Sequence, residues 1–304
     1  TADLGTVGRF FRKLKDDYSE IKPGAPVGTY TGSLAFAQGW FLDTDYIAAA
    51  DIRSFSVIDD NGTTRNPPNL QSLVISGVSA GWRVAASARS EERLDQLAVS
   101  AGQASVRSYP LDVTDSAAVA ATVARIEEEW GPIEVAILNA GDYEPMSLEQ
   151  FDAALFRRLV EVNYMGAVHC LDALLPRLRR RRSGQLLLTA SVSGYRGLPS
   201  GAPYSATKAA LINLAEALQP ELAAQGVRIR VINPGFVDTP LTRKNRFAMP
   251  FLMTAEQAAT RIVAKLEGSA FEIAFPRRFV WLLKLLRCLP YPVYFALVRR
   301  MTRT

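Results

Sequence analysis

The chain has 304 residues, 48% of them hydrophobic and 21% charged, which is the composition of an ordinary globular protein. Its two cysteines exclude a disulfide-stabilised framework and indicate a reducing compartment, which we expect to be the cytoplasm. The net charge of +5 is concentrated in residues 276–304, which carry seven basic side chains and no acidic one. Because the remainder of the chain is close to neutral, the charge does not indicate a nucleic-acid-binding protein.

Residues 1–69 contain no pattern that assigns them a function. The run from Arg9 to Lys15 is basic and amphipathic, and Asn61-Gly62 predicts a hairpin turn. The stretch Asn66-Pro67-Pro68-Asn69 then has the composition of a linker. We therefore treat residues 1–69 as an unassigned N-terminal extension that serves for packing or for binding a partner.

From Leu70 onward, apolar runs alternate with helical stretches, a pattern typical of a doubly wound parallel α/β sheet with crossover helices. This pattern predicts one main domain at residues 70–275, followed by a basic amphipathic tail at residues 276–304. Seven parallel strands are expected, at residues 70–76, 81–88, 105–111, 135–138, 186–191, 227–232 and 271–275. Helices are expected at residues 115–130, at about 148–178, from about 203 onward and at 254–268.

Tyr204 and Lys208 are four residues apart at the start of an expected helix, so their side chains lie on one face of it. A nearby cation stabilises a phenolate and lowers a tyrosine pKa that is otherwise near 10, which suits a proton-transfer catalyst. Ser191 ends an expected strand upstream, and the carboxyl ends of strands are where ligands bind in open α/β sheets. On its own the Tyr204–Lys208 spacing is weak evidence, because most such pairs are surface partners on an ordinary helix.

Three further groups of residues stand at characteristic places around this pair. Asn139-Ala140-Gly141 ends another strand, and Asn163 lies inside a long helical stretch. Asn233-Pro234-Gly235 follows the strand at 227–232, with Thr239 shortly after it. Taken together and in this order, the motifs resemble those of the short-chain dehydrogenase/reductase family over residues 70–275.

The resemblance implies a Rossmann-type fold and an NAD(P)-dependent oxidoreductase that interconverts a hydroxyl and a carbonyl on an apolar small molecule by hydride transfer. It implies that Tyr204 is the general acid and base, that Lys208 lowers its pKa, and that Ser191 holds the substrate oxygen. Asn163 would position a water that relays protons to Lys208. The remaining implied cofactor contacts are Asp112 with the adenine, Asn139, Ala140 and Gly141 beside the adenine ribose, and Pro234, Gly235 and Thr239 at the carboxamide. Family members usually pair through two long helices, so a homodimer or homotetramer is implied as well.

The phosphate-binding loop departs from the family pattern. Gly77-Val78-Ser79 resembles the opening of this loop, but only five residues, Gly77 to Gly81, separate the first two expected strands. A parallel crossover needs about a dozen residues or more, usually including a helix. Two interpretations remain open: the printed sequence omits a segment between Ser79 and Ala80, or the protein is a non-catalytic relative that binds or scaffolds without this loop. The match of both flanks to the family favours the first.

Arg89 follows the second strand, where enzymes that use NAD usually carry a carboxylate. An arginine there suits a ribose 2′-phosphate, so NADP(H) is favoured over NAD(H), unless Arg89 merely begins a solvated helix. Asp112 has a similar alternative as a helix cap, for which Thr114 is a second candidate. The single histidine, His169, is interpreted as structural, and no metal site is expected.

The tail at residues 276–304 is basic and aromatic, and charges together with Pro290 and Pro292 interrupt its apolar runs. No such run is long enough to span a bilayer. Two interpretations remain open: peripheral contact with a membrane surface, or packing at a subunit interface or over the substrate pocket. By the resemblance, residues 241–253 form the lid over the substrate.

Overall fold

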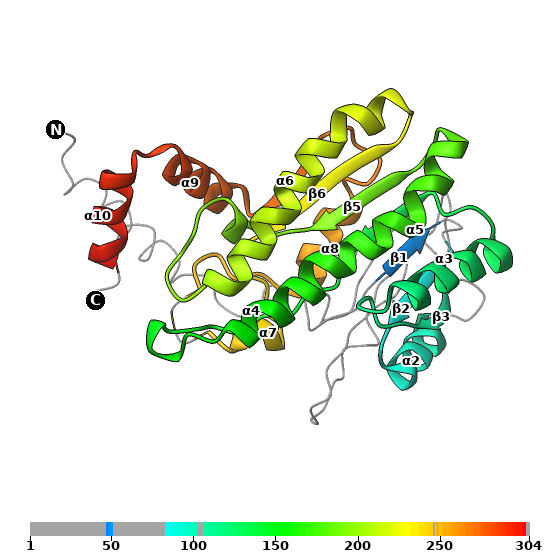
Figure 1. Ribbon diagram of the computed structural model, residues 1–304, viewed down its shortest axis with the longest axis horizontal. Helices are drawn as coiled ribbons and strands as arrows, with labels where there is room; N and C mark the ends of the chain where they lie inside the picture. The colour runs from blue at the N-terminus through cyan, green and yellow to red at the C-terminus, as the bar shows by residue number, and fades with distance from the viewer. Residues whose placement is uncertain (1–46, 51–82, 102–105, 246, 248, 302–304) are drawn as a thin grey trace, which may run out of the picture. The chain divides into compact units, whose positions relative to one another are not determined.

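The computed structural model describes residues 47–50, 83–101, 106–245, 247 and 249–301. In this part of the chain a seven-stranded sheet is covered by helices on both faces (Figure 1). The strands are β1 (Ile47–Ala50), β2 (Val84–Ala88), β3 (Val106–Pro110), β4 (Val135–Leu138), β5 (Gln185–Thr189), β6 (Arg228–Pro234) and β7 (Glu272–Phe275). The α-helices are α2 (Glu91–Ala101), α3 (Ser116–Trp130), α4 (Ala153–Val160), α5 (Gly166–Arg181), α6 (Ala202–Ala224), α7 (Pro240–Arg243), α8 (Ala255–Val263), α9 (Arg277–Cys288) and α10 (Tyr291–Met301). The 3₁₀ turns η3 (Leu148–Gln150) and η5 (Val192–Gly194) and the π-helical turn η4 (Glu161–Met165) complete the elements.

The strands lie in the order β3-β2-β1-β4-β5-β6-β7. β2 pairs with β3 in parallel, and β4, β5, β6 and β7 form a second parallel run. The strand order reverses between these two runs, so the sheet is doubly wound, as predicted. The carboxyl ends of these strands meet at one edge of the sheet, which is where a ligand site is expected.

The central strand differs from the expected one. The predicted first strand at residues 70–76 lies outside the described residues, and Ile47–Ala50 occupies the position between β2 and β4. β1 runs antiparallel to both neighbours, with Ile47 opposite Leu138 and Ala50 opposite Val135. The inner edges of β2 and β4 carry backbone N–H and C=O groups that need partners, and a short extended segment satisfies them in either direction. The first residue of β1 therefore lies at the edge where β4 ends, and its last residue lies at the opposite edge.

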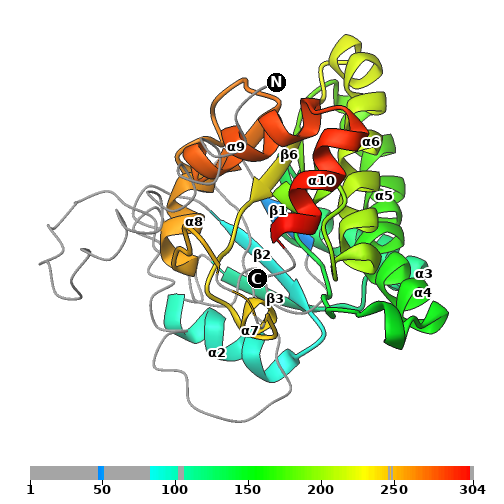
Figure 2. The same cartoon turned by 90° about the vertical axis from the view of Figure 1, so that its left-hand side faces the viewer.

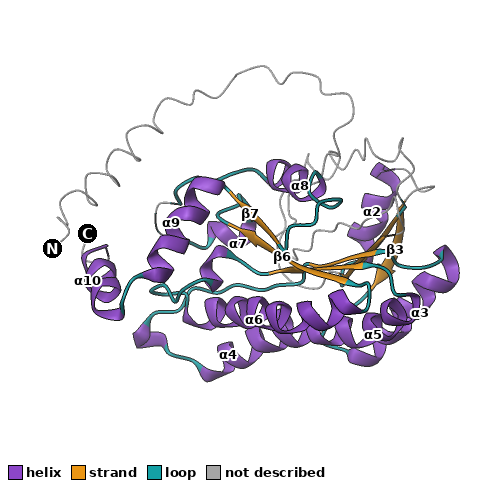
Figure 3. Cartoon of the chain, turned by 90° about the horizontal axis from the view of Figure 1, so that it is seen from above, coloured by secondary structure: helices purple, strands orange, loops and turns teal. Residues whose placement is uncertain are grey.

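Two apolar layers hold the helices to the sheet (Figure 3). On one face, side chains such as Val123 of α3, Leu174 of α5 and Leu211 of α6 pack against β4 and β5. On the other face, Leu94 of α2 and Ile262 of α8 pack against the sheet. Burial of a Leu or Ile side chain stabilises a fold by roughly 1.5–3 kcal/mol, so both layers fix the strand ends that carry the site.

Local capping decides where several helices start. Asp115 accepts a hydrogen bond from the backbone N–H of Ala118 at 2.9 Å and caps α3, so neither Asp112 nor Thr114 is its cap. The single long helix expected at residues 148–178 is instead divided. Asp152 accepts a hydrogen bond from Ala154 N–H at 2.8 Å and starts α4 there, after the short turn η3.

The tail forms two helices, α9 and α10, that lie together beyond the loop leading into α6 (Figures 1 and 2). Arg196 in that loop donates to the carbonyl oxygens of Leu286, Arg287 and Leu289 at 3.0, 2.7 and 2.8 Å. The hydroxyl of Tyr294 in α10 donates to the carbonyl oxygen of Gly197. The tail is thus attached to the body of the domain. Among the helices that the structure describes, none combines the length and apolarity needed to cross a bilayer.

Candidate active site

Ser191 lies just beyond the carboxyl end of β5. The buried residues of β5 hold this strand in the middle of the sheet, and the chain then turns into η5. The hydroxyl oxygen of Ser191 accepts a hydrogen bond from the backbone N–H of Ser193 at 3.1 Å, which caps the turn. The turn therefore holds Ser191 at the edge of the sheet where the parallel strands end.

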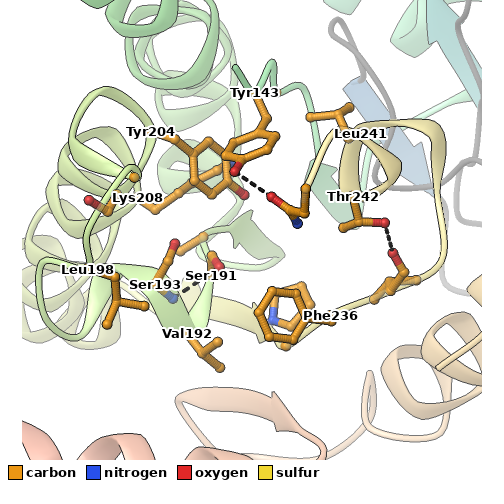
Figure 4. Close-up of a pocket in the computed structure, with 18 of the residues that line it drawn as sticks. Tyr143, Ser191, Val192, Ser193, Leu198, Tyr204, Lys208, Phe236, Leu241 and Thr242 are labelled. Atoms are coloured by element: carbon orange, nitrogen blue, oxygen red, sulfur yellow. Dashed lines mark hydrogen bonds between the residues drawn. The ribbon is translucent and has the colours of Figure 1, made fainter. Parts of the chain in front are cut away.

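Tyr204 and Lys208 lie one turn apart near the start of α6, as the four-residue spacing predicts. The ammonium nitrogen of Lys208 donates to the carbonyl oxygen of Thr189 at 2.8 Å and lies 5.5 Å from the centre of the Tyr204 ring. Lys208 is 2% exposed, so its charge is held away from water. Tyr204, Lys208 and Ser191 line one pocket (Figure 4).

Burial moves the pKa values of both side chains. It raises the pKa of the Tyr204 hydroxyl, and hydrogen bonding with Ser191 only partly opposes this. It lowers the pKa of Lys208 to about 7. The expected lowering of the tyrosine pKa by the lysine does not appear in this structure, where the Lys208 ammonium donates to Thr189. Tyr204 is therefore protonated at neutral pH, whereas Lys208 titrates close to it.

Asn163 lies within η4, where the helix makes a π-helical turn between α4 and α5. Its side-chain oxygen accepts from the backbone N–H of Asp142 at 2.6 Å, and its amide donates to Asp142 O and Thr207 Oγ1, both at 3.0 Å. Such turns are rare and occur frequently at functional sites. The side chain of Asn163 thus ties the turn after β4 to α6, beside Lys208.

The turn after β4 passes close to both side chains. An added Cβ at Gly141 would lie 3.3 Å from Lys208 Nζ and 3.6 Å from Asn163 Oδ1. Asn139 and Gly141 line the pocket, and Ala140 packs against the apolar layer behind it. A glycine at position 141 therefore leaves the space next to the lysine open.

The end of β6 contributes a second side of the pocket through Pro234 and Gly235. Thr239 lies behind this side. It is 1% exposed, and its side chain and that of Thr242 cap α7 reciprocally. The structure therefore brings Pro234 and Gly235 to the pocket but gives Thr239 a capping position outside its lining.

Arg89 and Asp112 are brought together in a different pocket, of about 920 Å³. The side chain of Asp112 accepts hydrogen bonds from the backbone N–H and the hydroxyl of Thr114 at 2.9 and 2.7 Å. Arg157 and Arg158 of α4, which no sequence pattern indicated, line the same pocket. Three arginines thus surround this space, while Gly77 and Ser79 lie outside the described residues.

His169 and Cys170 lie in α5, away from the pocket. His169 Nδ1 lies 2.9 Å from the carbonyl oxygen of Val113, and Cys170 is a buried free thiol. The contact of His169 fits its structural interpretation, and Cys170 is part of the apolar core.

Tyr143 was not anticipated from the sequence. Its ring meets the Tyr204 ring edge-on, with centroids 5.1 Å apart at 81°, and its hydroxyl donates to Asn245 Oδ1 at 2.6 Å (Figure 4). Lys244 reinforces this contact by donating to the carbonyl oxygen of Tyr143 and to Glu144, both at 3.0 Å. The only available signal was the position of Tyr143, directly after the Asn139–Gly141 motif. The hydrogen bond from Tyr143 to Asn245 ties the segment after α7, part of the expected lid, to the end of β4.

The apolar wall of the pocket also comes partly from distant segments. Phe236 follows β6 and Leu198 precedes α6, whereas Phe279 and Leu283 belong to α9. The rings of Phe236 and Phe279 are 5.5 Å apart. The tail therefore contributes to the pocket lining, which is one of the two alternatives that the sequence left open.

The family model described as short chain dehydrogenase matches residues 71–249. The chain belongs to the short-chain dehydrogenase family. It is 33% identical over 223 residues, 73% of this chain and 88% of the relative, to an uncharacterised oxidoreductase of Myxococcus xanthus (strain DK1622). The family and the oxidoreductase relative confirm the prediction, made from the motifs, that the chain is a dehydrogenase/reductase.

Two solved structures resemble this short-chain dehydrogenase. One is a short-chain dehydrogenase from Burkholderia cenocepacia J2315 in complex with NADP, with a TM-score of 0.62 and 27% identity over 71% of this chain and 86% of that one. The other is an alcohol dehydrogenase from the archaeon Thermococcus sibiricus complexed with 5-hydroxy-NADP, with a TM-score of 0.55 and 29% identity over 63% and 84% of the two chains.

The polar groups of this pocket fit a polar ligand such as a dinucleotide cofactor. The buried hydroxyl oxygens of Thr189 and Ser193 line the pocket and have no hydrogen-bond partner among the described residues. Buried polar atoms are normally paired, so a polar ligand suits this edge of the sheet. The Lys208 ammonium is the charged donor at the same place.

Proposed function

We propose that the protein is an NADP(H)-dependent oxidoreductase that interconverts a carbonyl and a hydroxyl on an apolar small molecule. The observation that carries the proposal is that Ser191, Tyr204 and Lys208 line one pocket whose other wall is apolar. A half-buried phenol beside a lysine and a serine hydroxyl is a group that can exchange a proton with a substrate oxygen. The family to which the chain belongs supports the same reaction class.

The roles follow from the chemistry of each side chain. In carbonyl reduction, the Tyr204 hydroxyl gives its proton to the carbonyl oxygen, to which the Ser191 hydroxyl donates a hydrogen bond. Lys208 holds a proton at Nζ, and its charge offsets the negative charge that remains on the Tyr204 oxygen. Asn163 keeps the strand-end turn in place beside Lys208. The Tyr204 hydroxyl is protonated at neutral pH, so it has the proton that carbonyl reduction needs.

The bound nicotinamide supplies the hydride chemistry. We propose that Pro234 and Gly235 flank this end of the cofactor and that Asn139, Ala140 and Gly141 lie beside the adenine ribose. Thr239 caps α7 behind this wall and would act by holding the segment after β6 in place. At the other end, Asp112 would contact the adenosine, and Arg89 would favour NADP(H) over NAD(H), because a guanidinium pairs well with a phosphate. The NADP bound by the Burkholderia cenocepacia relative agrees with this choice.

The substrate is proposed to be apolar because of what surrounds the reacting groups. Leu198, Phe236, Phe247, Phe279 and Leu283 line the pocket. Apolar lining with a few well-placed polar groups is typical of sites that bind small organic molecules. We therefore expect ketones or aldehydes with extended apolar parts to be better substrates than short polar ones.

Replacing Tyr204 by phenylalanine tests the proposal. The full chain is assayed for NADPH oxidation with a panel of apolar ketones and aldehydes. Since positioned proton transfer contributes about 10²–10⁴-fold, Tyr204→Phe should lower kcat by about that factor while circular dichroism stays unchanged. Tyr164→Phe, a matched change outside the pocket lining, should leave the rate as it is. Full activity of Tyr204→Phe would refute the assignment.

A further inference from the structure

Helix α9 is apolar on two opposite sides. One side is buried through Phe279, Val280 and Leu283, and the first and last of these line the pocket. On the other side Trp281 and Leu285 lie one turn apart, 69% and 63% exposed. A helix that is hydrophobic all round is normally buried, and gathered exposed apolar side chains mark an interaction site. The outer side of α9 is therefore expected to be covered by a partner.

Helix α10 extends this surface with aromatic side chains. Tyr291 and Phe295 are 70% and 50% exposed, and their rings stack with centroids 5.8 Å apart. Both helices lie at the same end of the described fold (Figures 1 and 2). Arg196 holds them there, because it donates to the carbonyl oxygens at the end of α9 and lies over the Tyr291 and Tyr294 rings at 5.0 and 4.0 Å. The exposed aromatic groups are thus carried on a fixed support.

Positive charge flanks these apolar groups. Arg277 and Arg278 are exposed at the start of α9, and Arg299 and Arg300 are exposed at the end of α10. Neither helix contains an acidic residue. A second copy of the chain pairing through the same surface would bring arginines against arginines, which is unfavourable. Anionic lipid headgroups above an apolar interior match both the charge and the apolar side chains.

We propose that α9 and α10 dock on an anionic lipid bilayer. The docking surface consists of Arg277, Arg278, Trp281, Leu285, Tyr291 and Phe295. The apolar and aromatic side chains enter the interface between headgroups and acyl chains, while the arginines contact lipid phosphates. The helices lie on the bilayer and do not cross it, since each is far shorter than the about 20 residues that a span requires.

Co-sedimentation with vesicles tests docking and requires neither cofactor nor substrate. The full chain is mixed with vesicles of phosphatidylcholine alone or with added phosphatidylglycerol. Binding is expected to the anionic vesicles and to be at least about tenfold weaker to the neutral ones or at high salt, because a basic residue near the surface contributes about 1 kcal/mol. A bilayer result of either sign leaves the proposed enzymatic function unaffected.

Paired substitutions locate the binding on this surface. The double variants Trp281→Ser/Leu285→Ser and Arg277→Gln/Arg278→Gln should each weaken binding to anionic vesicles by roughly tenfold or more. All four side chains are exposed, so thermal melts should be unchanged. Leu148→Ser, which removes an 82% exposed leucine on η3, is the matched control and should bind like wild type. Equal binding to neutral and anionic vesicles, or binding that both double variants retain, would overturn the proposal. So would a lipid-free dimer that the same variants dissociate, which would make the surface a subunit interface.

Discussion

The ammonium group of Lys208 is buried and donates to the carbonyl oxygen of Thr189 at 2.8 Å. Loss of water disfavours the charged form, so the pKa of Lys208 falls from its usual value near 10.4 to about 7. The same burial raises the pKa of Tyr204. Burial therefore makes the phenol a weaker acid and the amine a weaker base than they are in water.

The depressed pKa of Lys208 predicts how stability depends on pH. The folded protein binds fewer protons at this site than the unfolded chain between pH 7 and about 10.4, so its free energy of unfolding rises with pH in that range and the gain is lost as pH falls towards 7. The slope is at most about 1.4 kcal/mol per pH unit. Urea unfolding of wild type and of Lys208→Met between pH 7 and pH 10 should show this difference in slope. Parallel curves would contradict the shifted pKa.

At the scale of elements, the site depends on close contact between η5 and α6. Gly194 ends η5, and a Cβ there would lie 2.8 Å from the carbonyl carbon of Lys208 and 2.9 Å from the backbone nitrogen of Ala209. Both are helix backbone atoms that cannot rotate away. The missing side chain at position 194 therefore allows the turn that starts at Ser191 to approach the helix that carries Tyr204 and Lys208.

Gly194→Ala should separate η5 from α6. Overpacking of this kind costs about 1–3 kcal/mol of stability, and a misplacement of about 1 Å can lower a catalytic rate by up to about 10²-fold. We expect a lower unfolding midpoint and a fall of about tenfold or more in kcat/KM for carbonyl reduction. The control is Gly197→Ala in the following loop, where a Cβ meets no atom within 4 Å and should change neither quantity. Equal behaviour of the two variants would mean that the contact has no role in the site.

At the scale of the whole molecule, the central strand decides how the cofactor can be held. In a parallel arrangement, the loop after the first strand delivers backbone amides to the pyrophosphate. β1 runs antiparallel to β4, so its carboxyl end at Ala50 lies opposite Val135, at the other edge from the carboxyl ends of the parallel strands. Among the described residues, the cofactor contacts proposed here lie on β2, β3, β4 and β6 or directly after them, at the two ends of the dinucleotide.

Binding of NADPH should raise the melting temperature of the full chain. A ligand at about 100 times its Kd stabilises a protein by about 2.7 kcal/mol, which corresponds to about 5–10 °C for a domain of this size. NADH should give a smaller shift at the same concentration if Arg89 recognises the 2′-phosphate. Differential scanning fluorimetry measures the melting shifts with NADPH and with NADH. A separate intact-mass measurement shows whether further residues lie between Ser79 and Ala80. No shift at saturating NADPH would favour a relative that has lost cofactor binding.

Much of this architecture was predictable because the signals are local. The apolar runs that form β4 and β5 and the glycine that ends α3 are readable from a few neighbouring residues. The start of the long helix was mispredicted because one capping aspartate, Asp152, outweighs the helical pattern around it. The antiparallel β1 was not predictable, since strand direction is set by partners that are distant in sequence.

The sequence by itself determined the α/β class, the family, and the candidate residues Asn163, Ser191, Tyr204 and Lys208, because each depends on residue types at short, fixed spacings. Only the tertiary structure decided that Phe279 and Leu283 of the tail line the same pocket and that Tyr143 joins the segment after α7 to the strand end. It also decided the direction in which the pKa values of Tyr204 and Lys208 move. Burial, which moves both pKa values, comes from segments far apart in the chain and exists only once the fold has brought them together.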